Sequence, residues 1–285
     1  MKKILVTGSS GYIGTHLCAR IEGEYEVHRL DIVPFQKELQ YSYQDTYFPF
    51  DITKPFTNSE VVYDAVVHLA ALISVGESQE RPISYYITNL NGTMNVLNKI
   101  KTKNFIFAST GAAQYCESAY AISKRAAEDV VRSYCQMAKI DYTTFRFYNV
   151  IGSSVVLPKN PDGLMMKLIE AAKSGTFTIY GDKYQTPDGT GLRDYVHVDE
   201  ICDAIRAAIE KPANQIECLG HGVGHTVKEM TEIFQRVNNV KFDVKIGPER
   251  PGDVASSVLK DVSPYMQTLF TMDQLLTIPG LVPQQ

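Results

Sequence analysis

The sequence predicts an α/β protein: a doubly wound parallel sheet with a smaller C-terminal α/β portion. Two observations support this prediction. In the first half of the chain, short apolar runs rich in β-branched residues alternate with longer helical patterns, as in parallel sheets covered on both faces. After about residue 150, long polar loops separate short strands and helices.

The elements of the first half follow one another in a regular order. KKILVTG at 2–8 reads as a buried strand, and the segment at 13–23 reads as a helix that ends near Gly23. On the longest helix, Ile122, Ala126 and Val130 form the expected core-facing stripe, with Lys124 and Glu128 off it. In full, we expect strands at 2–8, 26–31, 65–71, 104–110 and 142–149, and helices at 13–23, 89–100 and 119–140.

The second half reads differently, with a loop at 158–163 and another at 181–194. Loops of that length in a compact enzyme usually cover a ligand. We expect strands at 176–181 and 241–247 and helices at 201–210 and 227–239. The predicted division is a nucleotide-binding domain at 1–150, to which 195–222 returns, and a smaller substrate-binding portion at 151–285.

Composition excludes several classes of function. The 285 residues carry a formal net charge of −4, which gives no attraction to nucleic acid or to an anionic membrane surface. The longest apolar stretch, 61–75, is interrupted by Asp64 and His68, so no membrane span is expected. The 5 cysteines include no CxxC pair, which indicates a reducing compartment and a cytoplasmic location.

A glycine-rich loop, GSSGYIG, joins the first strand to the first helix and places Gly8, Gly11 and Gly14 at the turn. The first glycine permits the turn, the second admits a pyrophosphate, and the third allows close helix packing. The helix N-terminus adds N–H donors for the anion. This context predicts dinucleotide binding on a Rossmann-type fold.

The expected cofactor is NAD. Asp31 ends the second strand, where a carboxylate accepts the ribose hydroxyls of NAD and repels a 2′-phosphate. The following residues, Ile32, Val33 and Pro34, offer no arginine for that phosphate.

Tyr120 and Lys124 form a YxxxK pair near the start of the long helix, so both side chains share one helix face. An ammonium beside the phenol, with an oxidised nicotinamide nearby, is expected to lower the tyrosine pKa and make it a general base. Ser109 and Thr110 end the preceding strand, and either hydroxyl could share the substrate proton. Each could equally be a strand-end cap.

Two arginines in glycine-bearing loops, Arg193 and Arg250, suit a diphosphate because their planar groups donate in pairs. His221 and His225 are spaced as metal ligands could be on a helix. The glycines between them indicate a loop, so no metal site is expected.

Together these motifs resemble the extended short-chain dehydrogenase/reductase superfamily. Within it they are most similar to the NAD-dependent epimerase/dehydratase family and its UDP-galactose 4-epimerases. The resemblance runs from residue 1 to about 260. It covers GSSGYIGTHL, SVGESQERPISYYITNLNGT at 74–93, YAISK, YGDKYQTPDGTGLRDYVHV and ERPGD.

The resemblance implies transient oxidation of a UDP-hexose at C4 by bound NAD⁺. Tyr120 would be the base, Lys124 its partner, and Thr110, with Ser109 second, the hydroxyl. It also implies a homodimer formed through helices at about 88–101 and 119–138. The NAD site would include Gly8, Gly11, Tyr12, Ile13, Gly14, Asp31, Asp51, Ile52, Leu69, Ala70, Ala71, Asn89, Tyr120, Lys124 and Tyr148; the nucleotide diphosphate would face Asn149, Arg193, Arg250 and Asp253.

The sugar stays open between a hexose and its N-acetylated form. Ile73 and Gly163 depart from the lysine and asparagine common in this family, and Ser257 lies near a position where a small side chain admits an N-acetyl group. A 4,6-dehydratase is disfavoured because Gly111 and Ala112 stand where its acid pair would lie. A sugar-nucleotide dehydrogenase or 4-ketoreductase, and a non-catalytic NAD-binding sensor, are the alternatives.

Overall fold

The computed structural model describes residues 1–33, 46–55, 60–158, 160, 162–250, 253–278 and 281. Pro34, Pro161, Pro251 and Gly252, which belong to segments used above, lie outside the described residues. The chain divides into two compact units, Met1–Phe147 with Cys202–Glu217, and Tyr148–Ile201 with Cys218–Gln285.

The first unit is organised around a seven-stranded sheet whose order among the described residues is β12-β8-β7-β5-β1-β2-β3. All the adjacent pairs from β8 to β3 run parallel. The doubly wound parallel sheet is therefore confirmed. Its strands are β1 (Lys3–Thr7), β2 (Glu26–Asp31), β3 (Thr46–Pro49), β5 (Ala65–His68), β7 (Asn104–Thr110), β8 (Asp141–Phe147) and β12 (Ile216–Leu219).

The strand order reverses between β1 and β5, because the chain first adds β2 and β3 on one side and later β5, β7 and β8 on the other. In open α/β sheets, ligands bind at the carboxyl ends of the strands beside such a reversal. The carboxyl ends of β1 and β5 therefore mark the expected cofactor position.

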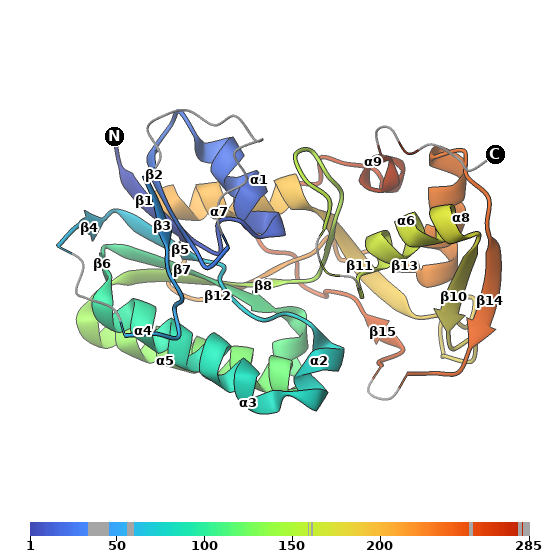
Figure 1. Cartoon of the computed structure of the whole chain (residues 1–285), viewed down its shortest axis with the longest axis horizontal. Helices are drawn as coiled ribbons and strands as arrows, with labels where there is room; N and C mark the ends of the chain where they lie inside the picture. The colour runs from blue at the N-terminus through green and yellow to red at the C-terminus, as the bar shows by residue number, and fades with distance from the viewer. Residues whose placement is uncertain are drawn as a thin grey trace. The chain divides into compact units, whose positions relative to one another are not determined.

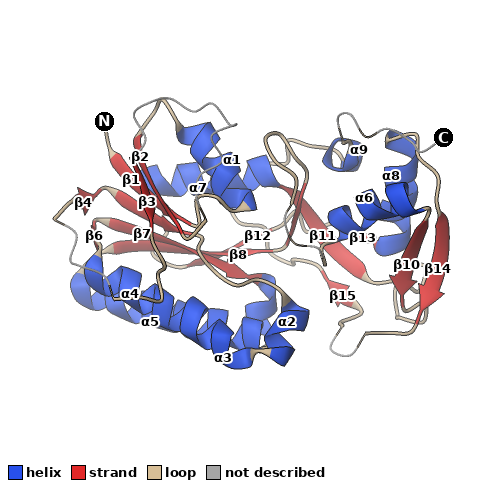
Figure 2. Ribbon diagram, in the orientation of Figure 1, coloured by secondary structure: helices blue, strands red, loops and turns tan. Residues whose placement is uncertain are grey.

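Helices cover both faces of this sheet, with α1 (Tyr12–Ile21) and α7 (Val198–Glu210) on one face and α4 (Gly92–Lys99) and α5 (Ala119–Ala138) on the other (Figures 1 and 2). The apolar core under α4 and α5 includes Leu5, Val66, Phe105 and Phe107. The remaining elements of this unit are short: β4 (Val62–Tyr63), β6 (Lys101–Thr102), α2 (Val75–Glu80), α3 (Pro82–Tyr85), the π-helix η1 (Tyr86–Asn91) and the 3₁₀-helix η2 (Gly111–Gln114).

Two predicted elements differ from the structure. The expected helix at 89–100 is the end of a longer helical stretch that starts with α3 at Pro82 and contains a π-helical turn. The expected strand at 142–149 is divided into β8 and β9 (Asn149–Ile151), and β9 pairs with β11 (Leu192–His197) instead of joining the central sheet. Strand propensity does not reveal which sheet a strand joins.

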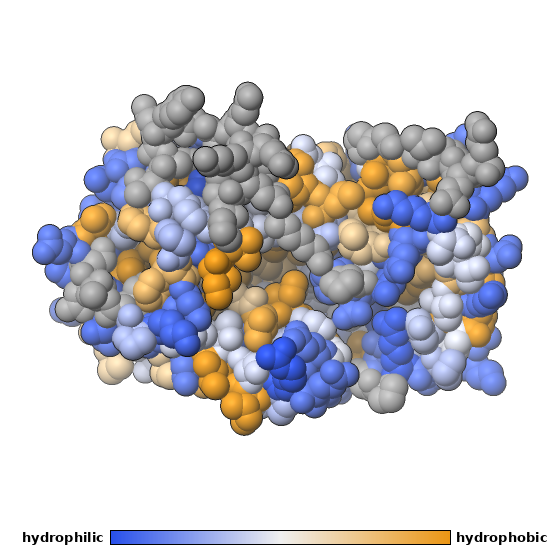
Figure 3. All heavy atoms as spheres, viewed as in Figure 1, coloured by the Kyte–Doolittle hydropathy of each residue, from blue (hydrophilic) through white to orange (hydrophobic). Residues whose placement is uncertain are grey.

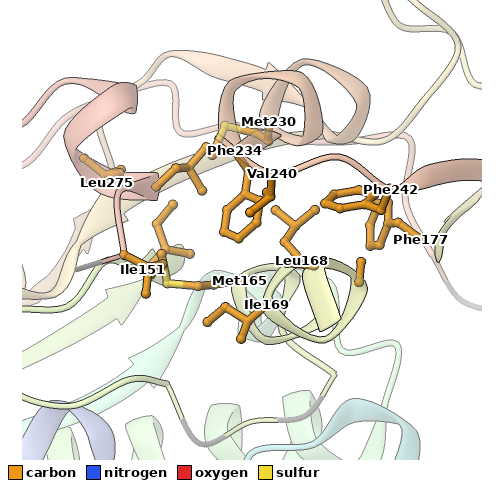
Figure 4. Packing of buried hydrophobic residues seen from close by; sticks show 14 of the residues in the cluster. Ile151, Met165, Leu168, Ile169, Phe177, Met230, Phe234, Val240, Phe242 and Leu275 are labelled. Carbon is orange, nitrogen blue, oxygen red and sulfur yellow. The ribbon is translucent and has the colours of Figure 1, made fainter. Parts of the chain in front are cut away.

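The second unit has its own hydrophobic core, in which Phe177, Phe234 and Phe242 pack together with Met230 and Leu168 (Figure 4). Phe177 and Phe242 meet edge to face, with ring centroids 6.2 Å apart. Its other elements are α6 (Leu164–Ser174), β10 (Thr176–Tyr180), β13 (Gly224–Thr226), α8 (Val227–Val237), β14 (Asp243–Gly247), β15 (Ser256–Ser257) and α9 (Met272–Leu276).

Hydrophobic side chains on the face shown in Figure 3 occur in small groups between hydrophilic ones. Within the described part of the chain, no helix combines the length and apolar character that crossing a membrane requires.

Candidate active site

The glycine loop between β1 and α1 is closed by backbone contacts that leave no room for side chains. Gly8 has a φ of +71°, and a Cβ there would lie 2.7 Å from the Ala70 nitrogen. A Cβ on Gly14 would lie 2.1 Å from the Gly8 carbonyl oxygen. The loop is therefore pressed against Leu69 and Ala70 at the end of β5. Gly11, at the N-cap of α1, has no side chain to cover the helix end.

Asp31 connects this loop to the end of β2. Its Oδ2 accepts the Ser10 N–H at 2.9 Å, and its Oδ1 accepts the Val33 N–H at 2.9 Å. The carboxylate thus lies beside the glycine loop, as a contact with a cofactor ribose requires. These features fit a dinucleotide, because the glycine loop at the helix N-terminus can bind a pyrophosphate and the Asp31 carboxylate lies next to that loop.

Other residues expected at the cofactor lie on the same unit. Tyr12 and Ile13 begin α1, and Ala71 follows Ala70. The Asp51 carboxylate accepts the Thr53 N–H and hydroxyl at 2.9 and 2.8 Å. Ile52 is buried, and a Cβ on Gly92 would lie 2.7 Å from its Cδ1.

Asn89 lies within the π-helical turn and is almost fully buried. Its side chain accepts the Leu72 N–H at 2.8 Å, and its amide donates to the Leu72 carbonyl and the Ser123 hydroxyl, each at 3.0 Å. Ser123 in turn donates to the Tyr120 carbonyl at 2.8 Å. Asn89 therefore ties the segment after β5 to the turn of α5 that carries Tyr120.

Helix α5 begins at Ala119 because Ser118 caps it, with its hydroxyl accepting the Ala121 N–H. The face that α5 buries is not the predicted one. Ser123, Lys124 and Glu128 are buried, whereas Ile122 is 41 % exposed. Apolar periodicity does not mark this face, because polar residues occupy several of its positions.

Tyr120 is half-buried near the carboxyl end of β7, with its ring edge to face with Tyr85 at a centroid distance of 6.4 Å. Burial raises the Tyr120 pKa, and the hydroxyl of Thr110 acts more weakly in the opposite direction. The pKa rises because removing the phenolate from water costs more than one hydrogen bond recovers. The lowering expected from the lysine ammonium together with an oxidised nicotinamide stays a prediction.

Lys124 is 3 % exposed, and its ammonium lies 4.4 Å from the centre of the Phe107 ring. Burial lowers its pKa to about 7, and the charge of Glu128 acts in the opposite direction. The His68 ring stacks with the same Phe107 ring at a centroid distance of 5.9 Å. Burial holds its pKa at about 3, so His68 is neutral near pH 7.

The two hydroxyls that end β7 have different partners. Thr110 accepts the Ala112 N–H at 3.2 Å and interacts with the Tyr120 phenol. Ser109 instead donates to Oε1 of Glu128 at 2.5 Å, inside the protein. The structure therefore brings Tyr120 and Thr110 together, carries Lys124 four residues beyond Tyr120 on α5, and places Ser109 in a separate hydrogen-bond group.

Glu128 and Arg146 are the residues of this region that the sequence analysis did not identify. Arg146 donates to Glu128 twice, through Nε at 2.8 Å and Nη2 at 2.6 Å. A signal was present, because Tyr120, Lys124 and Glu128 repeat at intervals of four residues and so share one helix face.

The second unit brings together three of the residues predicted to bind the diphosphate. Arg193, Arg250 and Asp253 all act electrostatically on the hydroxyl of Tyr184. The Asp253 N–H donates to the Arg250 carbonyl at 3.1 Å. The Arg250 guanidinium lies 3.9 Å from the centre of the Tyr180 ring.

Tyr184 was not predicted either, although it lies in the YGDKYQTPDGTGLRD segment. Its hydroxyl is buried and forms no hydrogen bond to any described residue. Asn149 donates to the Asp194 carbonyl at 2.9 Å. Ser257 is the register partner of Arg193 on the neighbouring strand. Tyr148 also belongs to this unit, and its contact with the cofactor stays a prediction.

The two histidines of the HGVGH segment pair with different carboxylates. His221 contacts Glu200 at 2.9 Å, and His225 contacts Glu229 at 2.8 Å. Among the described residues, no group of three His, Cys, Asp or Glu side chains is arranged to hold a metal ion.

Comparison with known proteins agrees with this geometry. Residues 4–218 match the model of the NAD dependent epimerase/dehydratase family. A UDP-glucose 4-epimerase of Caenorhabditis elegans is 30 % identical over 89 % of this chain and 88 % of its own.

Solved structures give the same result. The UDP-glucose 4-epimerase of Bifidobacterium longum, in complex with NAD⁺ and UDP, superposes with a TM-score of 0.82 at 25 % identity, covering 96 % of each chain. The UDP-Glc/GlcNAc 4-epimerase of Campylobacter jejuni gives 0.78 at 26 % identity over 97 % of each chain. With the family model matching most of its length, this chain belongs to the NAD dependent epimerase/dehydratase family.

Proposed function

We propose that this protein binds NAD and interconverts the C4 epimers of a UDP-hexose. The observation that carries the proposal is the contact of Tyr120 with Thr110 at the carboxyl end of β7, with the buried Lys124 four residues further along α5. The same unit holds the glycine loop and Asp31. A protein that only sensed NAD would need none of the side chains of Tyr120, Thr110 and Lys124.

The proposed chemistry assigns one role to each residue. Bound NAD⁺ supplies a reversible hydride acceptor at C4 and a positive charge that favours the phenolate. Tyr120 would take the proton of the C4 hydroxyl as the C4–H bond breaks, and would return it to the C4 oxygen as that bond re-forms on the other face of the sugar. Lys124, as an ammonium, stabilises the phenolate, and Thr110 holds the hydroxyl in place.

The second unit is proposed to bind the nucleotide diphosphate through Arg193 and Arg250. A guanidinium matches phosphate oxygens in pairs, and both arginines lie near the unpartnered Tyr184 hydroxyl. The small side chain of Ser257 beside Arg193 leaves both a hexose and an N-acetylhexosamine as substrates to test.

The experiment is incubation of the purified protein with UDP-galactose and, separately, with UDP-N-acetylgalactosamine, scoring the 4-epimer by chromatography. Conversion without net NADH supports the proposal. Net accumulation of NADH would identify a dehydrogenase, and no conversion of either sugar, with or without added NAD⁺, would contradict the proposed activity.

We also propose a cytoplasmic homodimer. Ile83, Ile87, Met94 and Ile122 are exposed on helices α3, η1, α4 and α5, which form one layer of the first unit. Such a surface is typical of a subunit interface. Light scattering during size-exclusion chromatography tests the dimer: an Ile87→Glu substitution should produce a monomer, and a wild-type monomer would contradict it. Cell fractionation tests the location.

A further inference from the structure

Next to the proposed catalytic pair, the carboxylate of Glu128 is held by the guanidinium of Arg146 and the hydroxyl of Ser109. The side chain of Glu128 is 1 % exposed and that of Arg146 11 % exposed. Ser109 and Arg146 are register partners on β7 and β8, so each of these two strands contributes one side chain that binds the Glu128 carboxylate of α5. A bidentate pair with a third hydrogen bond is a rigid arrangement.

This arrangement holds the Glu128 carboxylate one helical turn beyond Lys124. The spacing of four residues places Tyr120, Lys124 and Glu128 on the same face of α5. Because Lys124 is buried, its charged form depends on a nearby negative charge, and Glu128 is the carboxylate that acts on it.

The other groups around these residues do not take over that role. His68, whose ring stacks with Phe107, is neutral, and Tyr120 is a neutral phenol until it acts as a base. Arg125 approaches Glu128 to 3.9 Å but is 45 % exposed and also pairs with Asp129 at 3.6 Å. Arg146 is bound to Glu128 itself.

We propose that Glu128 is a positioning residue that keeps Lys124 in its ammonium form beside Tyr120, and that Arg146 and Ser109 hold Glu128 in place for this purpose. The inference rests on the proposed function, in which the charged form of Lys124 stabilises the phenolate. It also assigns Ser109 to the support of Glu128 and not to proton transfer.

The test compares Glu128→Gln with Asp129→Asn, which removes a carboxylate from the exposed face of the same helix. Two quantities are measured: the pH dependence of kcat/KM, and the titration of Lys124 by NMR of 13Cε-labelled lysine, assigned with Lys124→Arg. In Glu128→Gln, loss of the negative charge should move the Lys124 midpoint to lower pH by about one pH unit. The alkaline limb of kcat/KM should move with it. Glu128→Asp should restore part of both shifts, and Asp129→Asn should leave both unchanged.

An unchanged Lys124 midpoint in Glu128→Gln, or an equal shift in Asp129→Asn, would overturn the proposal. If Glu128→Gln fails to fold because Arg146 is left as an unpaired buried charge, the Glu128→Gln/Arg146→Met double variant removes both charges. Because loss of the Arg146 charge acts on Lys124 in the opposite direction, this double variant is compared with Arg146→Met: the Lys124 midpoint must be lower in the double variant, or the proposal is wrong. If the wild-type protein epimerises no UDP-hexose, the proposed function fails, while the NMR titration still decides the role of Glu128.

Discussion

The hydroxyl oxygen of Ser109 lies 2.5 Å from Oε1 of Glu128, and this contact separates two adjacent hydroxyls into different roles. Ser109 is bound to a buried carboxylate, whereas its neighbour Thr110 interacts with the phenol of Tyr120. Of these two adjacent residues at the end of β7, Ser109 therefore holds Glu128 in place, and Thr110 belongs to the proposed reaction centre.

Removing the Thr110 hydroxyl should therefore affect mainly turnover, and removing the Ser109 hydroxyl mainly stability. Thr110→Val should lower kcat by about 100-fold with little change in thermal stability, because it removes a donor at the reacting oxygen. Ser109→Ala should cost about 1–3 kcal/mol of unfolding free energy, since it removes a partner of a buried charge, and should lower kcat far less. Steady-state kinetics and chemical denaturation measure the two effects, with Thr110→Ser as the control that keeps the hydroxyl. Equal losses of kcat in the two variants would refute the division.

Tyr120→Phe should reduce kcat by about 1,000-fold while NAD binding survives, because only the proton-transfer group is lost. The matched control is Tyr85→Phe. The Tyr85 ring touches Tyr120, but its hydroxyl donates to Glu77 at 3.0 Å instead. Turnover and NAD titrations of both variants provide the test, and undiminished turnover in Tyr120→Phe would disprove its role as the base.

Gly14→Ala should abolish NAD binding and destabilise the protein by about 1–3 kcal/mol or more, because overpacking forces the loop open. The new Cβ would lie 2.1 Å from the Gly8 carbonyl oxygen. Gly76→Ala is the control: a Cβ there has nothing within 4 Å, and a helical alanine should stabilise by about 0.5–1 kcal/mol. Thermal unfolding with and without NAD measures both, and normal NAD affinity in Gly14→Ala would contradict the proposed loop function.

Asp31→Asn should weaken NAD binding by about 10-fold, because the charged acceptor of the ribose hydroxyls is lost. The ratio of NAD affinity to NADP affinity should fall, because the negative charge that repels the 2′-phosphate is also lost. Asp64→Asn is the control. Asp64 also accepts a backbone N–H, that of Lys3 at 2.8 Å, but lies before the amino end of β5. Calorimetric titration with NAD and with NADP measures both affinities. An unaltered ratio of these affinities in Asp31→Asn would count against the ribose contact.

The buried pair of His221 and Glu200 should make stability depend on pH. The hydrogen bond to Glu200 raises the pKa of His221, so its contribution is complete below the unfolded value of about 6.5 and is lost as pH rises through the higher folded pKa. Hydrogen bonds from His221 and from backbone N–H groups hold the Glu200 pKa low, so this carboxylate stays charged over that range.

His221→Gln should therefore lower Tm most at pH 6, and less at pH 9. Calorimetric scans of wild type and variant across that range check this, and taking their difference cancels the contribution of other buried groups such as His68. A constant difference in Tm would show that the pair does not carry the pH dependence.

The parts of the fold and site that local patterns encode were predictable. The GSSGYIG turn, Asp31 at the end of β2 and the four-residue spacing of Tyr120 and Lys124 are local features, because their geometry follows from the strand, turn and helix in which they occur. The parallel sheet follows from strands that are apolar on both faces.

Long-range packing decided the rest. Sequence periodicity favoured Ile122 as a buried residue, yet the helix buries Lys124 and Glu128, because Arg146 and Ser109 on two neighbouring strands supply the partners that a buried charge requires. Burial, which only the folded chain creates, also raises the pKa of Tyr120 and lowers that of Lys124. The sequence by itself determined the sheet, the glycine turn and the proposed catalytic pair. Only the tertiary structure decided that Glu128 and Arg146 are paired next to that pair, since the two residues lie on different elements that pack together in the folded chain.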